Sequence, residues 1–392
     1  MDPEHSEERQ RRDAKRELAK LEARLAGDLD EAYTLRQWSE VWMTKHLAPD
    51  ASPVTVYSYR WLLDSRILPQ LGDTPLEDLT PALLTDWLYN LRQEKRKTTR
   101  MNEAQLSRPR TDAEIRKLKQ STVAGKPLAI KTILLYYGCM RTMLAAAVRV
   151  GILEHNPMDR VQRPKKPRKK ISTLTEEEAV ALLRLVITDA SQSLRLAVML
   201  ALLCSLRLGE VCALTWQDFD DRTGTITVSR ALKYTPQEGS FIAETKTAAG
   251  DRVITLPAAM VQILKDAQVE DQFDHVDDPE KWLGGPGWIV HSRHGARVNK
   301  DTPSKWFRSF ADAHGFRGVT FHDLRHAHAS LLVASGADVA TIAARMGHSD
   351  PSVTLSVYTP ALPQRDQAAA AALDHLLTAA LPAPDQPDPA GS

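Results

Sequence analysis

The sequence predicts a mostly α-helical protein with one small antiparallel β-sheet, divided into two main domains. Three observations carry this prediction. Apolar residues recur at helical spacing through most of residues 34–162 and again after residue 172, whereas strand-like alternation is confined to 224–230 and 252–256. The length of 392 residues exceeds that of one typical domain. A basic segment punctuated by prolines, residues 163–171, separates the two helical regions.

The first region predicts a charged extension followed by an all-helical domain. Residues 1–33 contain one short amphipathic helix that ends at Gly27. Residues 34–162 carry the apolar stripes of several helices. They are interrupted over 93–127 by a basic insertion that is poor in large apolar side chains, which we interpret as a surface loop or helix.

The second region predicts a helical domain with a small sheet over residues 172–362. It opens with Thr175 and Glu178, which have the spacing of a capping box at a helix start. A long apolar helix precedes the two strand-like segments. The residues just before the second segment, 246–251, resemble a hairpin turn.

The last segment, residues 363–392, predicts a helix and then a disordered tail rich in proline and aspartate. The alanine-rich stretch 364–381 has an apolar face. Because such a face is costly in water, we expect this helix to dock on a neighbouring protomer or, alternatively, on its own domain.

Composition excludes several classes of protein. With 43% hydrophobic and 26% charged residues the chain is an ordinary globular one. It has no apolar run near the roughly 20 residues that span a bilayer, and no apolar core of a signal peptide, so we expect a cytoplasmic protein without a membrane partner. The three cysteines form no CxxC pair, which favours buried, reduced thiols over a disulfide framework or a zinc ribbon.

Charge is distributed unevenly, although the formal net charge is only +1. Residues 92–131 and 160–170 are both strongly basic, which is typical of a surface that meets a phosphate backbone. A solvated linker or a localisation signal is the alternative for either segment alone. The basic side chains that we expect to contact phosphates between the domains are Lys165, Lys166, Arg168, Lys169 and Lys170.

Four separated positions in the second region carry candidate site residues. The first two supply cations and a proton carrier. Arg207 opens a helix, where the helix N-terminus and a guanidinium fork both favour an anion; alone, it is more simply the ion-pair partner of Glu210. His322 and Arg325 lie three residues apart after the capping-box pair Thr320 and Asp323, so they share one helix face.

The other two positions follow at a fixed spacing. His348 comes directly after Gly347, which has the position of a helix C-cap, and Tyr358 lies ten residues later. Alone, Tyr358 is more simply a packing residue. A metal site using His322 and His326 lacks the HExxH glutamate and a third ligand, so we expect no metal.

Taken together, these motifs resemble the tyrosine recombinases, the phage integrase family. The arginine turn, HDLRH, the Gly-His pair and the later tyrosine occur in the family's order, and GDTPLEDL and GILEHNP resemble the wording of its helical domain. The resemblance covers about residues 34–362 and implies a helical core-binding (SAM-like) domain followed by an α+β catalytic domain. The catalytic residues that it implies are Arg207, Lys246, His322, Arg325, His348 and the nucleophile Tyr358, with Glu210 supporting the first arginine.

The resemblance also implies an activity. A site-specific recombinase of this family cleaves and rejoins DNA through a 3′-phosphotyrosine intermediate without ATP, and the chain has no GxxxxGK[ST] loop. We expect no cofactor, specific double-stranded DNA sites as substrate, and integration or excision of a phage or other mobile element. A monomer in solution, a homo-tetramer on DNA, nucleoid association and a directionality or accessory protein are further expectations.

The sequence departs from the family pattern at two places, and rival functions remain. Ser205 stands where the family usually has glycine, and its small size predicts little damage. Residues 1–31 are too short and too helical for the small β-sheet domain that binds accessory arm sites. The alternatives are a Xer-like recombinase that resolves chromosome dimers, a type IB topoisomerase and a catalytically idle DNA-binding regulator. The complete set of six site residues argues against the regulator.

Overall fold

The computed structural model describes residues 33–94, 127–165, 174–244, 250–277, 287–348 and 350. The chain divides into two compact units, 1–169 and 170–392, and each is described here by itself. Within the described ranges, no helix is long and apolar enough to cross a membrane. The predicted N-terminal helix, nearly all of the basic insertion and the predicted helix 364–381 lie outside the described residues.

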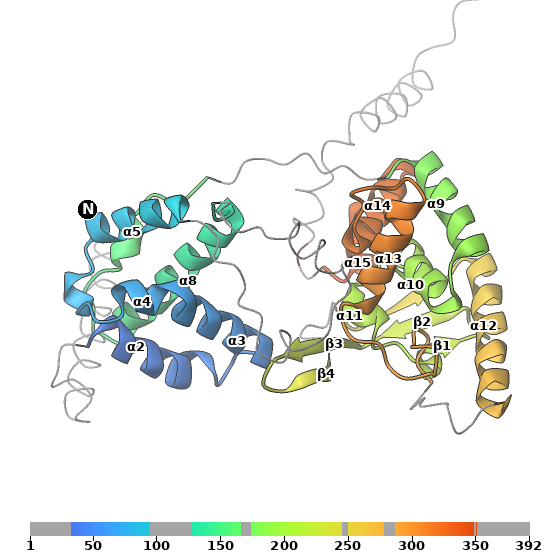
Figure 1. Ribbon diagram of the computed structural model, residues 1–392, viewed down its shortest axis with the longest axis horizontal. Helices are drawn as coiled ribbons and strands as arrows, with labels where there is room; N and C mark the ends of the chain where they lie inside the picture. The colour runs from blue at the N-terminus through green and yellow to red at the C-terminus, as the bar shows by residue number, and fades with distance from the viewer. Residues whose placement is uncertain are drawn as a thin grey trace, which may run out of the picture. The chain divides into compact units, whose positions relative to one another are not determined.

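The described part of the N-terminal unit is helical, as the sequence predicts (Figure 1). Its elements are α2 (Leu35–Val41), the π-helical turn η1 (Trp42–Leu47), α3 (Pro53–Leu62), the π-helical turn η2 (Leu63–Ile67), α4 (Leu68–Leu71), η3 (Leu76–Asp78), α5 (Pro81–Gln93), α8 (Ile130–Arg149) and η4 (Pro157–Arg160). The core of this unit contains the buried side chains of Trp38, Trp42 and Tyr136. The Trp38 indole N–H donates to the Met143 carbonyl at 3.0 Å, which ties α2 to α8.

Local residues explain where these helices begin. Thr34 forms a capping box with the first turn of α2. The hydroxyls of Ser52 and Thr80 accept backbone N–H groups at the starts of α3 and α5. Pro53 and Pro81 follow them at the first helical position, where a missing N–H costs nothing.

The C-terminal unit is a helical body with a small sheet. Its elements are α9 (Glu176–Asp189), α10 (Gln192–Leu203), α11 (Leu208–Val211), η5 (Trp216–Asp218), β1 (Phe219–Asp220), β2 (Thr225–Val228), β3 (Arg230–Thr235), β4 (Gly239–Glu244), β5 (Arg252–Thr255), α12 (Ala258–Asp277), α13 (Thr302–Ala313), α14 (Phe321–Ala334) and α15 (Val339–Met346). Helix α10 is buried along most of its length and packs against α9, α13 and α14. The predicted capping box of Thr175 and Glu178 starts α9. Cys204 and Cys212 are buried free thiols in this unit.

The sheet differs from the prediction in its connections. β2 pairs antiparallel with both β1 and β5, and Thr225 lies opposite Thr255. The segment 224–230 was predicted as one strand, but β2 ends at Val228 and Arg230 begins β3. β3 and β4 form a separate antiparallel hairpin that the sequence analysis missed, and Figure 1 shows it extending from the edge of the unit opposite α12. The residues predicted as a turn before β5 therefore connect β4 to β5.

A second, smaller core lies between α14 and α15. Its buried members are Ala329, Val333, Ile342 and Met346. Asp338 is the N-cap of helix α15, and its carboxylate accepts the Thr341 N–H at 2.8 Å. It ends at Gly347 in the left-handed conformation, with φ 63°, which confirms the predicted C-cap.

Candidate active site

Arg207 lies in the turn between α10 and α11, where it is the N-cap of α11. Just before it, Ser205 has φ 59°, and it is the one residue other than glycine with positive φ in the described chain. In α11, a Cβ on Gly209 would lie 2.8 Å from the Leu232 carbonyl oxygen of β3, so only glycine allows this approach. The turn therefore places Arg207 where α11 meets β3.

Glu210 anchors Arg207 through both its carboxylate oxygens. Oε1 accepts from Arg207 Nη1 at 2.8 Å, and Oε2 accepts the Arg207 backbone N–H at 2.9 Å. Arg207 is thus an ion-pair partner of Glu210, as the simpler interpretation of the sequence predicts. The Arg207 side chain nevertheless stays 41% exposed, and its Nη2 donates to the Gly347 carbonyl at 2.9 Å.

A second cation, Arg252 at the start of β5, also contacts the Glu210 carboxylate. Arg252 Nη2 donates to Glu210 Oε2 at 2.9 Å, and both side chains are almost fully buried. Burial by itself would raise the pKa of Glu210. The hydrogen bond and charge of Arg252, helped by Arg207, outweigh burial and hold that pKa below its ordinary value, so the carboxylate stays ionised.

Arg325 lies in the first half of α14 and is 2% exposed. Its Nη1 donates to the Ser205 carbonyl and its Nη2 to the Met346 carbonyl. One guanidinium therefore bridges the turn that carries Arg207 and the end of α15. Asp323 accepts both the N–H and the hydroxyl of Thr320 at 2.7 Å, so the predicted pairing of these residues at the start of α14 is present.

His322 lies one helical turn before His326, and the two imidazole rings meet edge to face with centroids 4.7 Å apart. His322 is exposed, whereas Arg325 on the same turn is buried. Partial desolvation, followed by the charges of His326 and Arg325, lowers the pKa of His322. The ring is therefore neutral and able to accept a proton at neutral pH.

His348 follows Gly347 directly, and its N–H donates to the Ala343 carbonyl at 3.0 Å. Desolvation and the nearby charges of Arg325 and Arg207 lower its pKa to about 4. Two arginines and two neutral histidines, from the α10–α11 turn, α14 and the end of α15, thus belong to one site. Within the described ranges, no group of three His, Cys, Asp or Glu side chains could hold a metal ion.

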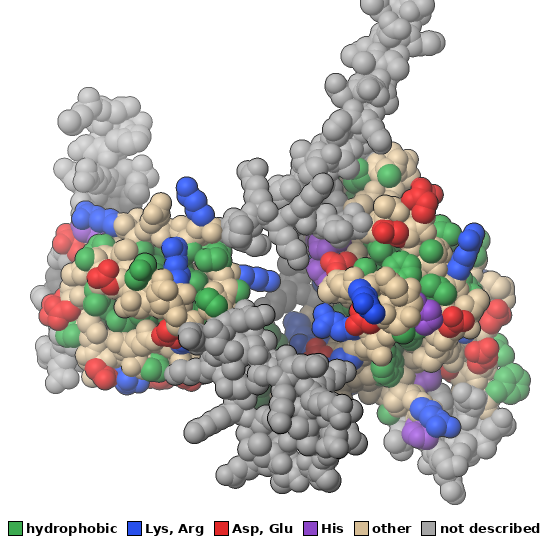
Figure 2. All heavy atoms as spheres, turned by 45° about the horizontal axis from the view of Figure 1, so that its top comes forward, with side chains coloured by type: hydrophobic (Ala, Val, Ile, Leu, Met, Phe, Trp, Pro, Cys, Tyr) green, Lys and Arg blue, Asp and Glu red, His purple; other side chains and the backbone are tan. Residues whose placement is uncertain are grey.

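Several predicted residues lie outside the described part of the chain. Lys246, in the connection between β4 and β5, is one, and Tyr358 is another. Lys165 is described and exposed, whereas Lys166, Arg168, Lys169 and Lys170 are not described. Figure 2 shows acidic and basic side chains interspersed on the visible face of each unit. Most of the two basic segments, 92–131 and 160–170, lies outside the described residues.

Arg252 is the site residue that sequence reasoning missed. In the sequence, Arg252 is recognisable only as the first residue of the predicted strand 252–256. No local pattern in the sequence marks Arg252. The need for it is visible only in the structure, where Glu210 is buried and Arg207 alone is too exposed to compensate its charge.

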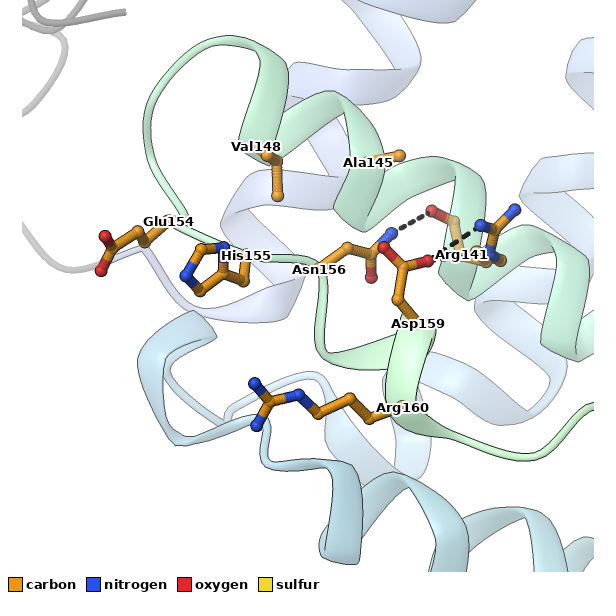
Figure 3. Close-up of a pocket in the computed structure, with 8 residues that line it drawn as sticks. All are labelled: Arg141, Ala145, Val148, Glu154, His155, Asn156, Asp159 and Arg160. Carbon is orange, nitrogen blue, oxygen red and sulfur yellow. Dashed lines mark hydrogen bonds and ion pairs between the residues drawn. The ribbon is translucent and has the colours of Figure 1, made fainter. Parts of the chain in front are cut away.

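A cavity of about 560 Å³ lies in the N-terminal unit (Figure 3). Arg141 in its wall forms an ion pair with Asp159 at 2.8 Å. The Asn156 side-chain amide donates to the Arg141 carbonyl, and its oxygen accepts the Met158 N–H, both at 3.0 Å. These contacts tie the GILEHNP segment to α8. The cavity is therefore part of a structural junction. Arg141, Arg160 and His155 line it together with the acidic side chains of Glu154 and Asp159.

Family models match both units. The phage integrase family matches residues 172–365, and the phage integrase N-terminal SAM-like domain matches residues 34–92. With the folds described above, these matches define a tyrosine-type site-specific recombinase. The chain belongs to the phage integrase family.

Individual relatives agree with this assignment. The ICEBs1 integrase of Bacillus subtilis is 31% identical over 59% of this chain, and the match spans 62% of that protein's length. The integrase of Mycobacterium phage D29 is 24% identical over 88% of this chain and 79% of its own. A XerC-like tyrosine recombinase of Caldanaerobacter subterraneus is 25% identical over 63% of this chain and 66% of its own.

Solved structures show the same fold. The Tn1549 transposon integrase, in complex with a circular intermediate DNA, has a TM-score of 0.62 at 18% identity and covers 83% of this chain and 95% of its own. A lambda integrase dimer bound to a core site has a TM-score of 0.54 at 20% identity, and the match covers 86% of this chain and 80% of the lambda integrase chain. The predicted fold class, a helical SAM-like domain with an α+β catalytic domain, is confirmed.

Proposed function

We propose that this chain integrates or excises a mobile element by cutting and rejoining specific DNA sites through a 3′-phosphotyrosine intermediate. The observation that carries this proposal is the convergence of Arg207, Arg325, His322 and His348 in the C-terminal unit. The similarity to integrases of phages and of ICEBs1 supports the mobile-element role. The substrate is double-stranded DNA, and the DNA in a solved integrase complex supports this class of substrate.

The chemistry follows from charge. Attack on a DNA phosphodiester raises the negative charge on the phosphorus oxygens from about −1 towards −2, and Arg207 and Arg325 supply fixed compensating charge. The Tyr358 oxygen forms the new bond to phosphorus while its proton passes to the neutral His322. The bond to the 5′ oxygen breaks, and Lys246 protonates that oxygen. His348 donates to a non-bridging oxygen.

The chain's organisation completes the proposal. Residues 34–162 form the core-binding domain with its basic insertion 93–127, and residues 172–362 form the catalytic domain. The linker 163–171 contacts phosphates. Four protomers act together on two DNA sites, and the helix 364–381 docks on the neighbouring protomer. The protein is a monomer before it binds DNA.

The test uses Tyr358→Phe, which removes the attacking oxygen and preserves shape. Wild-type protein incubated with a nicked suicide DNA, which traps the cleaved state, forms a covalent adduct on a denaturing gel. The variant binds the same DNA and forms none. EDTA leaves the wild-type adduct unchanged; loss of the adduct in EDTA would instead support a metal at His322 and His326. A persistent adduct in the variant removes Tyr358 from the nucleophile role.

Resolution of chromosome dimers is the second candidate, because a XerC-like recombinase is among the relatives. It uses the same residues and leaves the same adduct. Sequencing the genomic DNA trapped on the protein separates the two functions: mobile-element ends indicate an integrase, and a single chromosomal site outside any mobile element indicates a resolvase. Absence of any adduct with the wild-type protein indicates a DNA-binding regulator.

A further inference from the structure

We propose that Arg252 is a positioning residue for DNA strand cleavage, acting through Glu210 and through the end of α15. The inference rests on the proposed function, because it concerns the same site. Arg252 lies at the first position of β5, and its side chain is 7% exposed. It is not among the residues that we assign to contact with the phosphate.

Arg252 joins three chain segments with one guanidinium. Nη2 donates to Glu210 Oε2 at 2.9 Å in α11. Nε donates to the Arg345 carbonyl at 2.9 Å in the last turn of α15. Nη1 donates to the Gly250 carbonyl at 3.1 Å, at the end of the connection that contains Lys246. A guanidinium fork of this kind fixes direction as well as charge, which lysine does not.

Three consecutive carbonyls at the end of α15 accept from three different arginines. Arg252 binds the Arg345 carbonyl, Arg325 binds the Met346 carbonyl and Arg207 binds the Gly347 carbonyl. We call these acceptors the α15 carbonyl triplet. The last carbonyls of a helix have no partner within it, so they are strong acceptors for cations. His348 follows the triplet directly, and its place depends on this contact.

Arg252 influences the position of Arg207 electrostatically, through the charge of Glu210. With Arg252 present, Glu210 divides its negative charge between two guanidiniums. Without Arg252, a buried carboxylate faces Arg207 alone, which draws the Arg207 fork towards Glu210 or neutralises Glu210 by protonation. Either change displaces or releases the guanidinium that the transition state requires, and a misplacement of about 1 Å lowers a rate by up to about 100-fold.

The experiment compares Arg252→Ala and Arg252→Lys with a matched control, Arg230→Ala. Arg230 also lies at the first position of a strand in this unit and pairs with Asp218 at 2.6 Å. Cleavage is measured as single-turnover adduct formation on nicked suicide DNA at saturating protein, alongside DNA affinity and melting temperature. We expect Arg252→Ala to cleave about 10- to 100-fold more slowly with little change in affinity. Arg252→Lys is intermediate, and Arg230→Ala melts lower but cleaves at the wild-type rate.

A double-mutant cycle distinguishes positioning from a general structural role. In an Arg207→Ala background, the further change Arg252→Ala lowers the rate by a smaller factor than it does in the wild-type protein, because the part of its effect that passes through Glu210 and Arg207 is already lost. Full additivity overturns the proposal, and so does a wild-type rate for folded Arg252→Ala. If Arg252→Ala does not fold, Arg252→Lys carries the test, and a wild-type rate there overturns the proposal. A wild-type protein that forms no adduct overturns the proposed function instead.

Discussion

Ser205 combines two unfavourable features at a position next to the site. Its φ of 59° lies in the left-handed region, which costs a residue with a Cβ roughly 1–2 kcal/mol relative to glycine. Its hydroxyl is buried and has no hydrogen-bond partner among the described residues. The small size of serine predicted little damage here, but the position selects for backbone conformation.

We therefore expect Ser205→Gly to raise the free energy of unfolding by about 1 kcal/mol, after the greater freedom of glycine in the unfolded chain is subtracted. Ser205→Ala is the control, because it removes the hydroxyl but keeps the strained Cβ, and its gain is smaller. Denaturant unfolding of the full chain measures both. A glycine variant no more stable than the alanine variant contradicts the conformational argument.

His328 makes the stability of the C-terminal unit depend on pH. It is buried, and its Nδ1 lies 2.9 Å from the Leu202 carbonyl. Desolvation lowers its pKa from 6.5 to about 4. The folded chain therefore binds fewer protons than the unfolded chain between these values. This contribution to stability is complete above pH 6.5 and is lost as the pH falls towards 4.

The loss amounts to about 3 kcal/mol, at roughly 1.4 kcal/mol per pKa unit. We expect His328→Gln to flatten the decrease in unfolding free energy between pH 7 and pH 4.5, measured by urea unfolding. His155→Gln is the control, because His155 is exposed and lies in the other unit. An unchanged pH slope in His328→Gln would assign the acid sensitivity to other groups.

At the scale of elements, the start of α14 connects helix capping to chemistry. Asp323 there and Glu178 in α9 make equivalent capping contacts, to Thr320 and Thr175 respectively. Each alanine variant is expected to lose about 1 kcal/mol of stability. Only Asp323→Ala is expected also to slow adduct formation, because α14 carries His322 and Arg325. Equal cleavage rates for the two variants contradict this role of the cap.

Features of the fold that depend on neighbouring residues were predicted from the sequence. Features that depend on contacts between distant residues were not. Thr175, Thr320 and Gly347 are recognisable because a cap acts within one helical turn. The β3–β4 hairpin was missed because its side chains are mostly half-buried and lack the alternation of a strand with one buried face. Arg252 was missed because its partners lie 42 and 93 residues away along the chain.

At the scale of the whole molecule, the proposed DNA contacts of the linker make binding depend on salt. Changing Lys165, Lys166, Lys169 and Lys170 to glutamine should weaken binding to all sequences and lower the salt slope by about one for each lost phosphate contact. The same four positions changed to arginine keep the charge and should keep the slope. Binding titrations over a range of salt concentrations measure both, and identical slopes would show that the linker does not contact DNA.

The small core beneath α15 has a consequence for heating. Among the described residues, this core has four buried members, whereas α10 lies within the large core of the same unit. Segments with little buried apolar contact open at a lower free energy than the global one. We expect the backbone amides of α15 to exchange with deuterated solvent faster than those of α10. Because opening of α15 releases the acceptors of three arginines, warming should stop strand cleavage reversibly at temperatures where the protein still gives a folded circular-dichroism spectrum.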